Sequence, residues 1–412
     1  MEYTHRTIDL QLDELLNDLP AIALDGPKGV GKTETARRRA ATTIKLDEAA
    51  GRELYLATTH LNSLKTPIFI DEWQTIPDSW NKIRHYVDDG ASAASFLLAG
   101  SATPADPQGT HTGAGRIISL RMRPMGLHER NVHPTTVSLN QLFSSTSPVE
   151  GTSSFEMRDY TEEIMRSGLP GIRNFSKRGR TVQLESYLTR IVDRELPDAG
   201  YNLRNPQHFH QWLRAYAAAT GTTTSYAKLS AAVHQDGTQP AKITTQAYRE
   251  HLSRIWILDP LPGWLPAFNP LKRIGQSPKH YLADPALSAS LLNINPNNIF
   301  SSKQEFLGPL FEALSVLTVR VLSAGMWAKC YHLRNNNGTH EIDMIIENED
   351  GRILPVEIKL KSVIDERDVR HIHWLRNNWD GDLAPGLVIT TGQHAYRRAD
   401  GIAVVPLALL GH

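Results

Sequence analysis

Hydrophobic and polar positions alternate along this chain in blocks whose character changes twice. In the first third, short apolar runs are separated by stretches with helical spacing. This pattern is typical of an α/β unit whose parallel strands are buried on both faces. The runs that we expect to be strands are AIALD (21–25), TTIKLD (42–47), PIFID (67–71) and SFLLAG (95–100).

The middle of the chain follows a helical pattern instead. Three stretches, at 207–220, 225–233 and 242–258, place apolar residues at helical spacing, and a Pro- and Gly-rich segment (259–270) follows them. Three helices followed by an extended hairpin are the pattern of a winged helix. We expect Tyr248, Leu252 and Ile255 to face its core.

The last region returns to alternating strands and helices. A helix-like stretch (303–322) comes first, and a second helix (366–379) lies between later strand-like runs. This order predicts another α/β domain. Its expected strands are 327–334, 340–347, 353–361, 386–391 and 403–408.

Length and breakpoints divide the chain into three expected domains. Its 412 residues allow two to four units of about 100–200 residues each. Loop-rich segments at 143–155 and 291–304 interrupt the apolar pattern. We therefore expect domains at 1–150, 151–299 and 300–412.

Charge and cysteine content narrow the classes of protein. Lys+Arg and Asp+Glu are both 44, which excludes a polybasic binder. The net charge is −3 over 1–150, 0 over 151–200, +5 over 201–299 and −2 over 300–412, so only the middle leans basic. One cysteine, Cys330, excludes an internal disulfide. With no signal peptide and no run near the ~20 apolar residues of a membrane helix, we expect a cytoplasmic protein without membrane contact.

The first apolar run leads into the most specific motif of the chain. GPKGVGKT matches the phosphate-binding pattern GxxxxGK[ST] between a strand and a helix. Its backbone amides would surround the phosphates of ATP, while Lys32 reaches the β/γ oxygens and Thr33 offers a hydroxyl to Mg²⁺. The expected nucleotide-binding residues are Gly26, Pro27, Lys28, Gly29, Val30, Gly31, Lys32 and Thr33, together with Asp71.

Two carboxylates follow the third apolar run, where hydrolysis needs them. We expect Asp71 to hold the magnesium ion and Glu72 to polarise the attacking water. Ser101 follows the fourth run and is either a sensor of the γ-phosphate or an ordinary serine at a strand end.

Three arginines are candidates for stabilising charge during phosphoryl transfer. Arg116, Arg121 and Arg123 follow the four strands and could act within the chain or on a neighbouring subunit, which leaves a homo-oligomer open. The alternative for each is an ordinary surface arginine.

The last region contains a second chemical motif. Glu357 and Lys359 lie two residues apart in a strand, so they share one face, and Asp343 lies in the preceding strand. Asp343 and Glu357 would bind Mg²⁺, and Lys359 would orient water in phosphodiester hydrolysis. A salt-bridged pair of strands is the alternative.

These motifs together resemble a known family. GPKGVGKT, IFIDEWQTIPDSW, LLAGSAT and AGRIISLRMRPMGLHER resemble the bacterial and archaeal AAA-type ATPases whose P-loop domain is joined to a C-terminal DUF4143 domain. SGLPG, YLADPAL and EFLGPLFEALSV extend the resemblance over nearly the whole chain. It implies a winged-helix-like middle and a C-terminal fold similar to PD-(D/E)xK nucleases, in which Glu312 would complete the metal shell.

We therefore expect an AAA-like parallel sheet, a helical connector and a restriction-endonuclease-like α/β domain. The leading hypothesis is an ATPase that couples its nucleotide state to a DNA-binding, nuclease-like domain, with ATP and Mg²⁺ as cofactors. In the middle, Thr244, Thr245, Gln246 and Arg249 would contact DNA, although such modules also serve packing. The alternative is a regulatory or antitoxin-like switch that binds DNA or a protein partner without cleavage.

Overall fold

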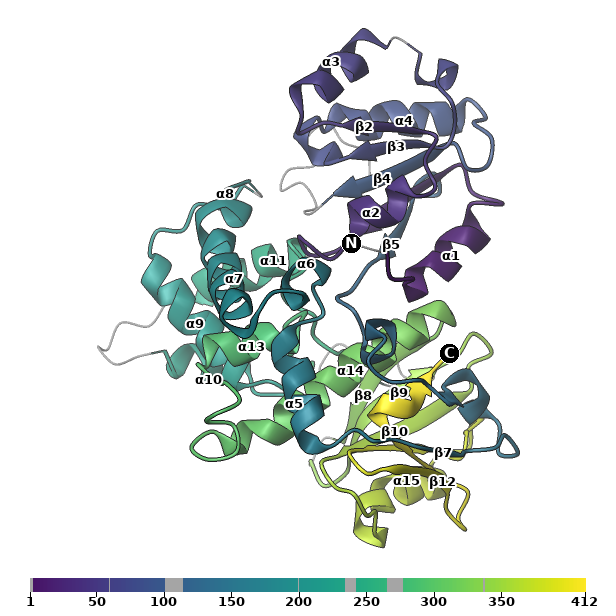
Figure 1. Cartoon of the computed structure of the whole chain (residues 1–412), viewed down its shortest axis with the longest axis vertical. Coiled ribbons are helices and arrows are strands. Elements are labelled where there is room, and N and C mark those ends of the chain that lie inside the picture. The colour runs from purple at the N-terminus through teal and green to yellow at the C-terminus, as the bar shows by residue number, and fades with distance from the viewer. Residues whose placement is uncertain are drawn as a thin grey trace.

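A computed structural model describes residues 3–58, 60–100, 114–198, 200–233, 242–264, 277–335 and 338–412 of the chain. Figure 1 shows a parallel sheet with helices near the N-terminus, a set of helices in the middle, and a mixed sheet in the C-terminal part of the chain.

The first sheet is formed by the four strands expected from the sequence and a fifth that we did not expect. Its order is β2-β3-β4-β1-β5, and all neighbours are parallel. Asp25 pairs with Gly100 and Asp71 with Ala99, so these carboxyl ends meet at one edge of the sheet. The strands are β1 (Ala21–Asp25), β2 (Thr42–Lys45), β3 (Ile68–Asp71), β4 (Phe96–Gly100) and β5 (Ile118–Arg121).

Helices cover this sheet through its apolar residues. Ile22, Leu24 and Phe69 belong to one core cluster, and their strand neighbours Ala23 and Ile70 belong to another. Alternate residues of a strand point to opposite faces, so both faces are buried, as the continuous apolar runs predict. The flanking helices are α1 (Thr7–Leu15), α2 (Lys32–Arg37), α3 (Ala49–Ala57) and α4 (Asp78–Asp88).

The middle region is helical and packs around aromatic side chains. Phe209, Trp212 and Tyr216 are completely buried, and Tyr248 joins them. The helices are α5 (Met157–Arg166), α6 (Pro170–Arg173), α7 (Lys177–Arg190), the π-helical turn η5 (Ile191–Glu195), α8 (Leu196–Asp198), α9 (Pro206–Ala218), α10 (Tyr226–Ala231), α11 (Lys242–Arg254) and α13 (Pro285–Leu291).

Helix α11 is the segment that we expected to contact DNA. Tyr248, Leu252 and Ile255 are buried, which confirms their assignment to the core. Thr245 is buried too, and its hydroxyl donates to the carbonyl of Lys242.

Other DNA-contact candidates on α11 are more accessible. Gln246 is exposed and Thr244 half-buried. The guanidinium of Arg249 lies 3.8 Å from the ring centroid of Tyr226, a cation–π contact within the protein. Much of the hairpin expected after α11, residues 265–276, lies outside the described residues.

The C-terminal sheet has the order β7-β12-β13-β11-β10-β9-β8. Strands β8, β9 and β10 form an antiparallel meander, and β11 pairs with β10 in parallel. Leu387 and Ile389 pack with α14, whereas Val388 packs with α15, so the two helices cover opposite faces. The elements are α14 (Leu307–Gly325), β8 (Lys329–Arg334), β9 (Glu341–Glu347), β10 (Ile353–Lys359), α15 (Glu366–Asn378), β11 (Leu387–Thr390), β12 (His394–Arg397) and β13 (Ala403–Pro406).

Helix α14 forms the centre of this region. We expected no run near membrane-spanning length, but the segment Gln304–Gly325 is long and apolar enough to cross a membrane by composition alone. However, 72% of an apolar 18-residue stretch of this segment is buried inside the protein. Packing against the sheet therefore accounts for its apolar composition.

The expected linker between the first two domains also contributes to the C-terminal sheet. Within it, β7 (Gly151–Thr152) pairs with β12 as an edge strand. Just before it, β6 (Val137–Ser138) pairs with β14 (Leu410–Gly411), the last strand of the chain. A polar, Gly-containing segment thus serves as a sheet edge because its neighbour is supplied by residues far away in the sequence.

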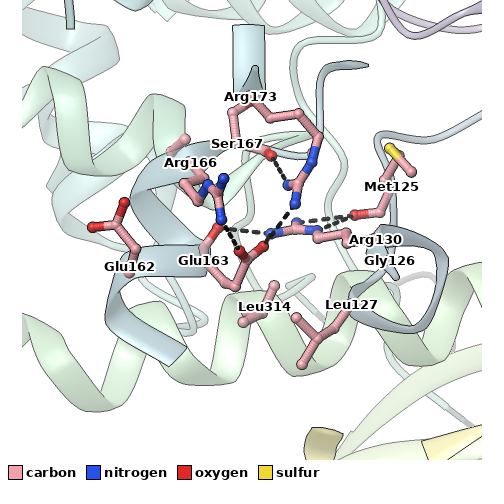
Figure 2. Close-up of polar contacts among 12 residues, drawn as sticks. Met125, Gly126, Leu127, Arg130, Glu162, Glu163, Arg166, Ser167, Arg173 and Leu314 are labelled. Atoms are coloured by element: carbon pink, nitrogen blue, oxygen red, sulfur yellow. Dashed lines mark hydrogen bonds and ion pairs between the residues drawn. The ribbon is translucent and has the colours of Figure 1, made fainter. Parts of the chain in front are cut away.

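A buried ion cluster joins the end of the first region to the middle. Figure 2 shows the carboxylate of Glu163 in α5 facing three arginines. Arg130, Arg166 and Arg173 each place a terminal nitrogen 3.2 Å from one of its oxygens. Arg130 also donates to the backbone carbonyls of Met125 and Glu163. Arg166 belongs to α5 itself, so Arg130 and Arg173 are the arginines that tie α5 to the neighbouring segments.

A second cluster of the same kind joins all three regions. Asp259, which is buried, lies 3.0 Å from Arg121, 2.8 Å from Arg123 and 2.9 Å from Arg320. The first two arginines come from β5 and the loop after it, and Arg320 comes from α14. The relative position of the sheet, the helical middle and the C-terminal domain is therefore fixed at one carboxylate.

Candidate functional site

The loop between β1 and α2 has the backbone that a phosphate-binding loop requires. A Cβ atom at Gly26 would lie 2.2 Å from the carbonyl oxygen of Met122, so no larger residue fits there. Gly31 has φ of 111°, a conformation that favours glycine. These two positions explain why the motif needs its glycines.

Lys32 begins α2 and folds back over this loop. Its Nζ donates to the carbonyl oxygens of Gly26 at 2.7 Å and Pro27 at 3.0 Å. Burial lowers the pKa of Lys32 to about 8, although Glu72 and the nearby aspartates oppose the shift. An ammonium whose hydrogen bonds go to neutral carbonyls can exchange these partners for phosphate oxygens, which attract it more strongly.

Thr33 and Asp71, the two expected magnesium ligands of the ATP site, lie side by side. The Thr33 hydroxyl donates to Asp71 Oδ1 at 3.2 Å. Burial raises the pKa of Asp71 to about 6, and the neighbouring Glu72 adds to this shift. A hydroxyl beside a carboxylate oxygen fits Mg²⁺, which binds few protein ligands in addition to phosphate oxygens.

Glu72 follows in a strained backbone conformation. Its φ of 50° is left-handed, which is uncommon for a residue other than glycine and is frequent at functional sites. The amide of Gln74 donates to Glu72 Oε2. We did not identify Gln74 from the sequence, although its place two residues after the carboxylate was the available signal.

The remaining candidates of the ATP site are distributed differently. Ser101 lies outside the described residues. Arg116 forms an exposed ion pair with Asp88 of α4, with 2.6 Å between Nε and Oδ1. Arg121 and Arg123 lie in the Asp259 cluster described above. In this structure, therefore, the three arginines contact carboxylates within the chain.

The phosphate loop also contacts the helical middle. Lys28 Nζ lies 2.9 Å from Glu195 Oε1 of η5, and the hydroxyl of Tyr187 in α7 donates to the Lys28 carbonyl at 3.1 Å. The sequence did not identify Glu195 or Tyr187, because both are more than 150 residues from the loop. A nucleotide bound to the loop would lie next to this helical segment.

The C-terminal candidates also lie together. Lys359 contacts the carboxylate of Glu357 on the same strand and lies 3.5 Å from Asp343 Oδ2 on β9. The backbone amide of Ile358 donates to that same Asp343 oxygen at 2.9 Å. Glu312, from α14, completes the group. The structure thus gathers the four residues that the sequence proposed.

A further cation, Lys279, lies within this carboxylate group. Its Nζ is 3.1 Å from Glu312, 3.1 Å from Glu341 and 3.0 Å from Asp343, and its side chain is 1% exposed. Tyr281 donates its hydroxyl to Glu312 Oε1 at 2.6 Å. Neither Lys279, Tyr281 nor Glu341 was identified from the sequence, because no motif contains them.

The ion pairs control the protonation of this group. Asp343 is buried, but the charges of Lys279 and Lys359 hold its pKa below the ordinary value. Burial and the charge of Asp343 raise the pKa of Glu357 well above its ordinary value. Burial also raises the pKa of Glu312. The carboxylates that the sequence proposed as metal ligands thus lie together, but Lys279 already lies among three carboxylates of this group.

The N-terminal geometry is that of a P-loop ATPase-type domain: a parallel sheet, a glycine-dependent phosphate loop and a carboxylate pair at the same edge. Comparisons with known proteins agree. Residues 18–131 match the model of an AAA domain. Residues 157–298 match a domain of unknown function, DUF8612, and residues 307–410 match another, DUF4143. The chain is thus a P-loop ATPase-like protein with a DUF4143 domain.

Similar proteins are known from two mycobacteria. The chain is 26% identical over 408 residues to the uncharacterized protein Rv2008c of Mycobacterium tuberculosis and to the uncharacterized protein Mb2031c of Mycobacterium bovis. Each alignment covers 96% of this chain and 82% of the relative.

Solved structures show more distant similarity. The Walker-type ATPase PABY2304 of Pyrococcus abyssi aligns with 70% of this chain and 96% of its own at a TM-score of 0.39 and 16% identity. A chain of the Drosophila ORC structure bound to DNA aligns with 69% of this chain and 94% of its own at a TM-score of 0.22 and 13% identity.

Proposed function

We propose that the protein hydrolyses ATP at the β1–α2 loop and transmits its nucleotide state to the helical middle and the DUF4143 domain, which binds DNA without cleaving it. The observation that supports coupling is the contact of the loop with α7 and η5 through Lys28, Tyr187 and Glu195.

The hydrolytic step follows from the residues at the sheet edge. Lys32 binds the β/γ oxygens, and Glu72, held by Gln74, orients the attacking water. Thr33 and Asp71 would hold the magnesium ion, which supplies positive charge against the phosphate oxygens. This division of roles is the one that P-loop ATPases require.

Coupling follows from competition for one lysine. The phosphates of ATP attract Lys28, and Glu195 attracts it in the absence of nucleotide. Bound phosphates also repel the carboxylate of Glu195, since like charges a few ångströms apart are unfavourable. Nucleotide binding therefore favours a shift of the α7–η5 segment, which belongs to the same helical region that contacts the C-terminal carboxylates through Lys279.

A polar groove at the junction with the C-terminal sheet supports DNA as the partner. It has a volume of about 560 Å³ and is lined by the hydroxyl-bearing residues 222–225, by Lys228 of α10 and by Arg334 of β8. Hydroxyl and cationic side chains are the usual contacts of the DNA backbone. The alternative partner is a protein, whose binding would not require the cationic side chains of this groove.

The ATPase assignment is tested by phosphate release from the wild type and two variants. We expect Lys32→Ala to lose ATP binding and turnover, and Glu72→Gln to retain binding while turnover falls by a factor of roughly 10² to 10³. Glu34→Gln, on the exposed side of α2, is the control with unchanged turnover. Undiminished turnover in both site variants would contradict the assignment.

The DNA assignment is tested separately by fluorescence anisotropy of labelled duplex DNA with ATP and with ADP. We expect Lys228→Ala and Arg334→Ala to weaken DNA binding and to make the DNA affinity less dependent on salt concentration. Incubation of DNA with Mg²⁺ or Mn²⁺ should give no cleavage by the wild type. Metal-dependent cleavage that is lost in Asp343→Ala and Lys359→Ala would instead support a nuclease.

A further inference from the structure

The ion pairs of Lys279 resemble the contacts of a bound metal ion. Three carboxylates from two elements, Glu312 of α14 and Glu341 and Asp343 of β9, place an oxygen about 3 Å from one buried nitrogen. Carboxylate oxygens that converge on one point are the ligands of Mg²⁺ and Mn²⁺. An ammonium therefore lies where these carboxylates would otherwise hold a divalent cation.

The helical region, and not the C-terminal domain, supplies this lysine. Lys279 lies within residues 157–298, which match DUF8612, whereas Glu312 and Asp343 lie within the DUF4143 match. Its backbone exchanges hydrogen bonds with Leu261 at 2.9 and 3.0 Å, and its neighbour Tyr281 bonds Glu312. The lysine is thus positioned by its own segment and reaches the cluster across a domain boundary.

The cluster keeps a capacity for more positive charge. Its four carboxylates, including Glu357, face three cations: the ammonium groups of Lys279 and Lys359, and the guanidinium of Arg334, which lies 3.9 Å from Glu341. In addition, Oε1 of Glu357 is buried and has no hydrogen-bond partner within the described part of the chain. A buried carboxylate oxygen of this kind is normally satisfied by a donor or a cation.

We infer that Lys279 takes the place of a divalent cation in the C-terminal carboxylate cluster and excludes metal while it is seated there. Withdrawal of the segment that contains Lys279 and Tyr281 would open a metal site formed by Glu312, Glu341 and Asp343, with Glu357 beside it across Lys359. The inference deepens the proposed non-cleaving role of the C-terminal domain and rests on it. It also names the helical region as the element that closes the site.

The test uses Mn²⁺ alone, without ATP or DNA, on the full-length chain. Binding is measured by electron paramagnetic resonance, and thermal unfolding is followed with and without Mn²⁺. We expect the wild type to show no Mn²⁺ site that depends on Asp343. Lys279→Met should gain one saturable site, and Mn²⁺ should raise its Tm by several degrees, because a ligand that binds only the folded state stabilises it.

Two further variants control for indirect effects. Lys279→Met/Asp343→Asn should lose the gained site, and Lys361→Met, which removes a lysine paired with Asp368 elsewhere in the domain, should behave as the wild type. If Lys279→Met gains no Mn²⁺ site, the inference is wrong.

The wild type and Asp343→Asn can still overturn the inference if Lys279→Met does not fold. A wild-type Mn²⁺ site that Asp343→Asn abolishes would also overturn the inference. Because the assay contains neither ATP nor DNA, its failure is distinguishable from a failure of the proposed ATPase or DNA binding.

Discussion

Two buried lysines, Lys32 in the phosphate loop and Lys279 in the C-terminal carboxylate cluster, have opposite surroundings. Lys32 is held by two neutral carbonyl oxygens, and burial lowers its pKa to about 8. Lys279 is held by three carboxylates, which overcome burial and raise its pKa well above the ordinary value. The charge of Lys32 is thus left for a ligand, whereas that of Lys279 is matched by the protein.

The difference shows how a structural ion cluster can be distinguished from a binding site. At the phosphate loop, three features are energetically unfavourable for the folded protein: a desolvated lysine, a raised pKa at Asp71 and a left-handed backbone at Glu72. Such features persist where function requires them. In the C-terminal cluster, burial raises the pKa of Glu312 and Glu357, but Lys279 and Lys359 stabilise the charged form of Asp343. Substitutions at the two sites should therefore have opposite effects on stability.

The largest expected effect is at Asp343. Asp343→Asn removes a carboxylate that contacts both Lys279 and Lys359, and loss of one partner of a buried ion pair costs about 3 kcal/mol. Denaturant unfolding at neutral pH measures the loss. The control is Asp382→Asn in the same domain, whose exposed pair with Arg352 contributes less than about 1 kcal/mol. Equal stability of the two variants would contradict a structural role for the cluster.

The pH dependence of ATP binding sharpens the comparison further. Below a pH of about 8, Lys32 is an ammonium that attracts phosphate, and above it the side chain becomes a neutral amine. We expect ATP affinity to fall as the pH rises above about 8, by at most about tenfold per pH unit. A fluorescent ATP analogue measures this affinity. Lys32→Ala should bind weakly without that dependence, and a pH-independent wild type would contradict the lowered pKa.

A smaller effect of opposite sign is expected at Asp71. Its pKa is raised from 3.8 to about 6, so the folded state binds a proton more readily than the unfolded state. The stability that this carboxyl contributes is therefore present at low pH and lost as the pH rises through about 6. Asp71→Asn should stabilise the magnesium-free protein at neutral pH by about 1 kcal/mol, measured by denaturant unfolding. Destabilisation similar to that of Asp343→Asn would remove the contrast between the sites.

The smallest expected effect concerns the contact between the loop and η5. Glu195→Gln removes the competitor of phosphate for Lys28, whose side chain is 58% exposed. Because exposed ion pairs contribute less than about 1 kcal/mol, ATP affinity should rise only about two- to fivefold. Calorimetric titration with ATP measures the change. Glu185→Gln, an exposed position of α7, should leave affinity unchanged, and equal affinities in all three proteins would remove the basis for coupling.

The sequence predicted much of the architecture because its patterns are local. The four N-terminal runs, three of the middle helices (α9, α10 and α11) and the main strands of the C-terminal sheet lie where their apolar spacing placed them. Strands β6 and β7 escaped notice because they are short and their partners lie far away in the sequence. The arginines after the sheet show the same limit, since only the fold places Arg121 and Arg123 against Asp259.

By itself, the sequence determined the phosphate loop and the pairing of Glu357 with Lys359, because each depends on backbone geometry within a few residues. Only the tertiary structure decided which charged groups of each site are neutralised by residues from other regions. Lys279 is 33 residues from Glu312 and 64 from Asp343, and it lies in no motif with them. Because side chains from separate regions meet only after the domains have packed, a residue pattern names the groups at a site, and packing decides what neutralises them.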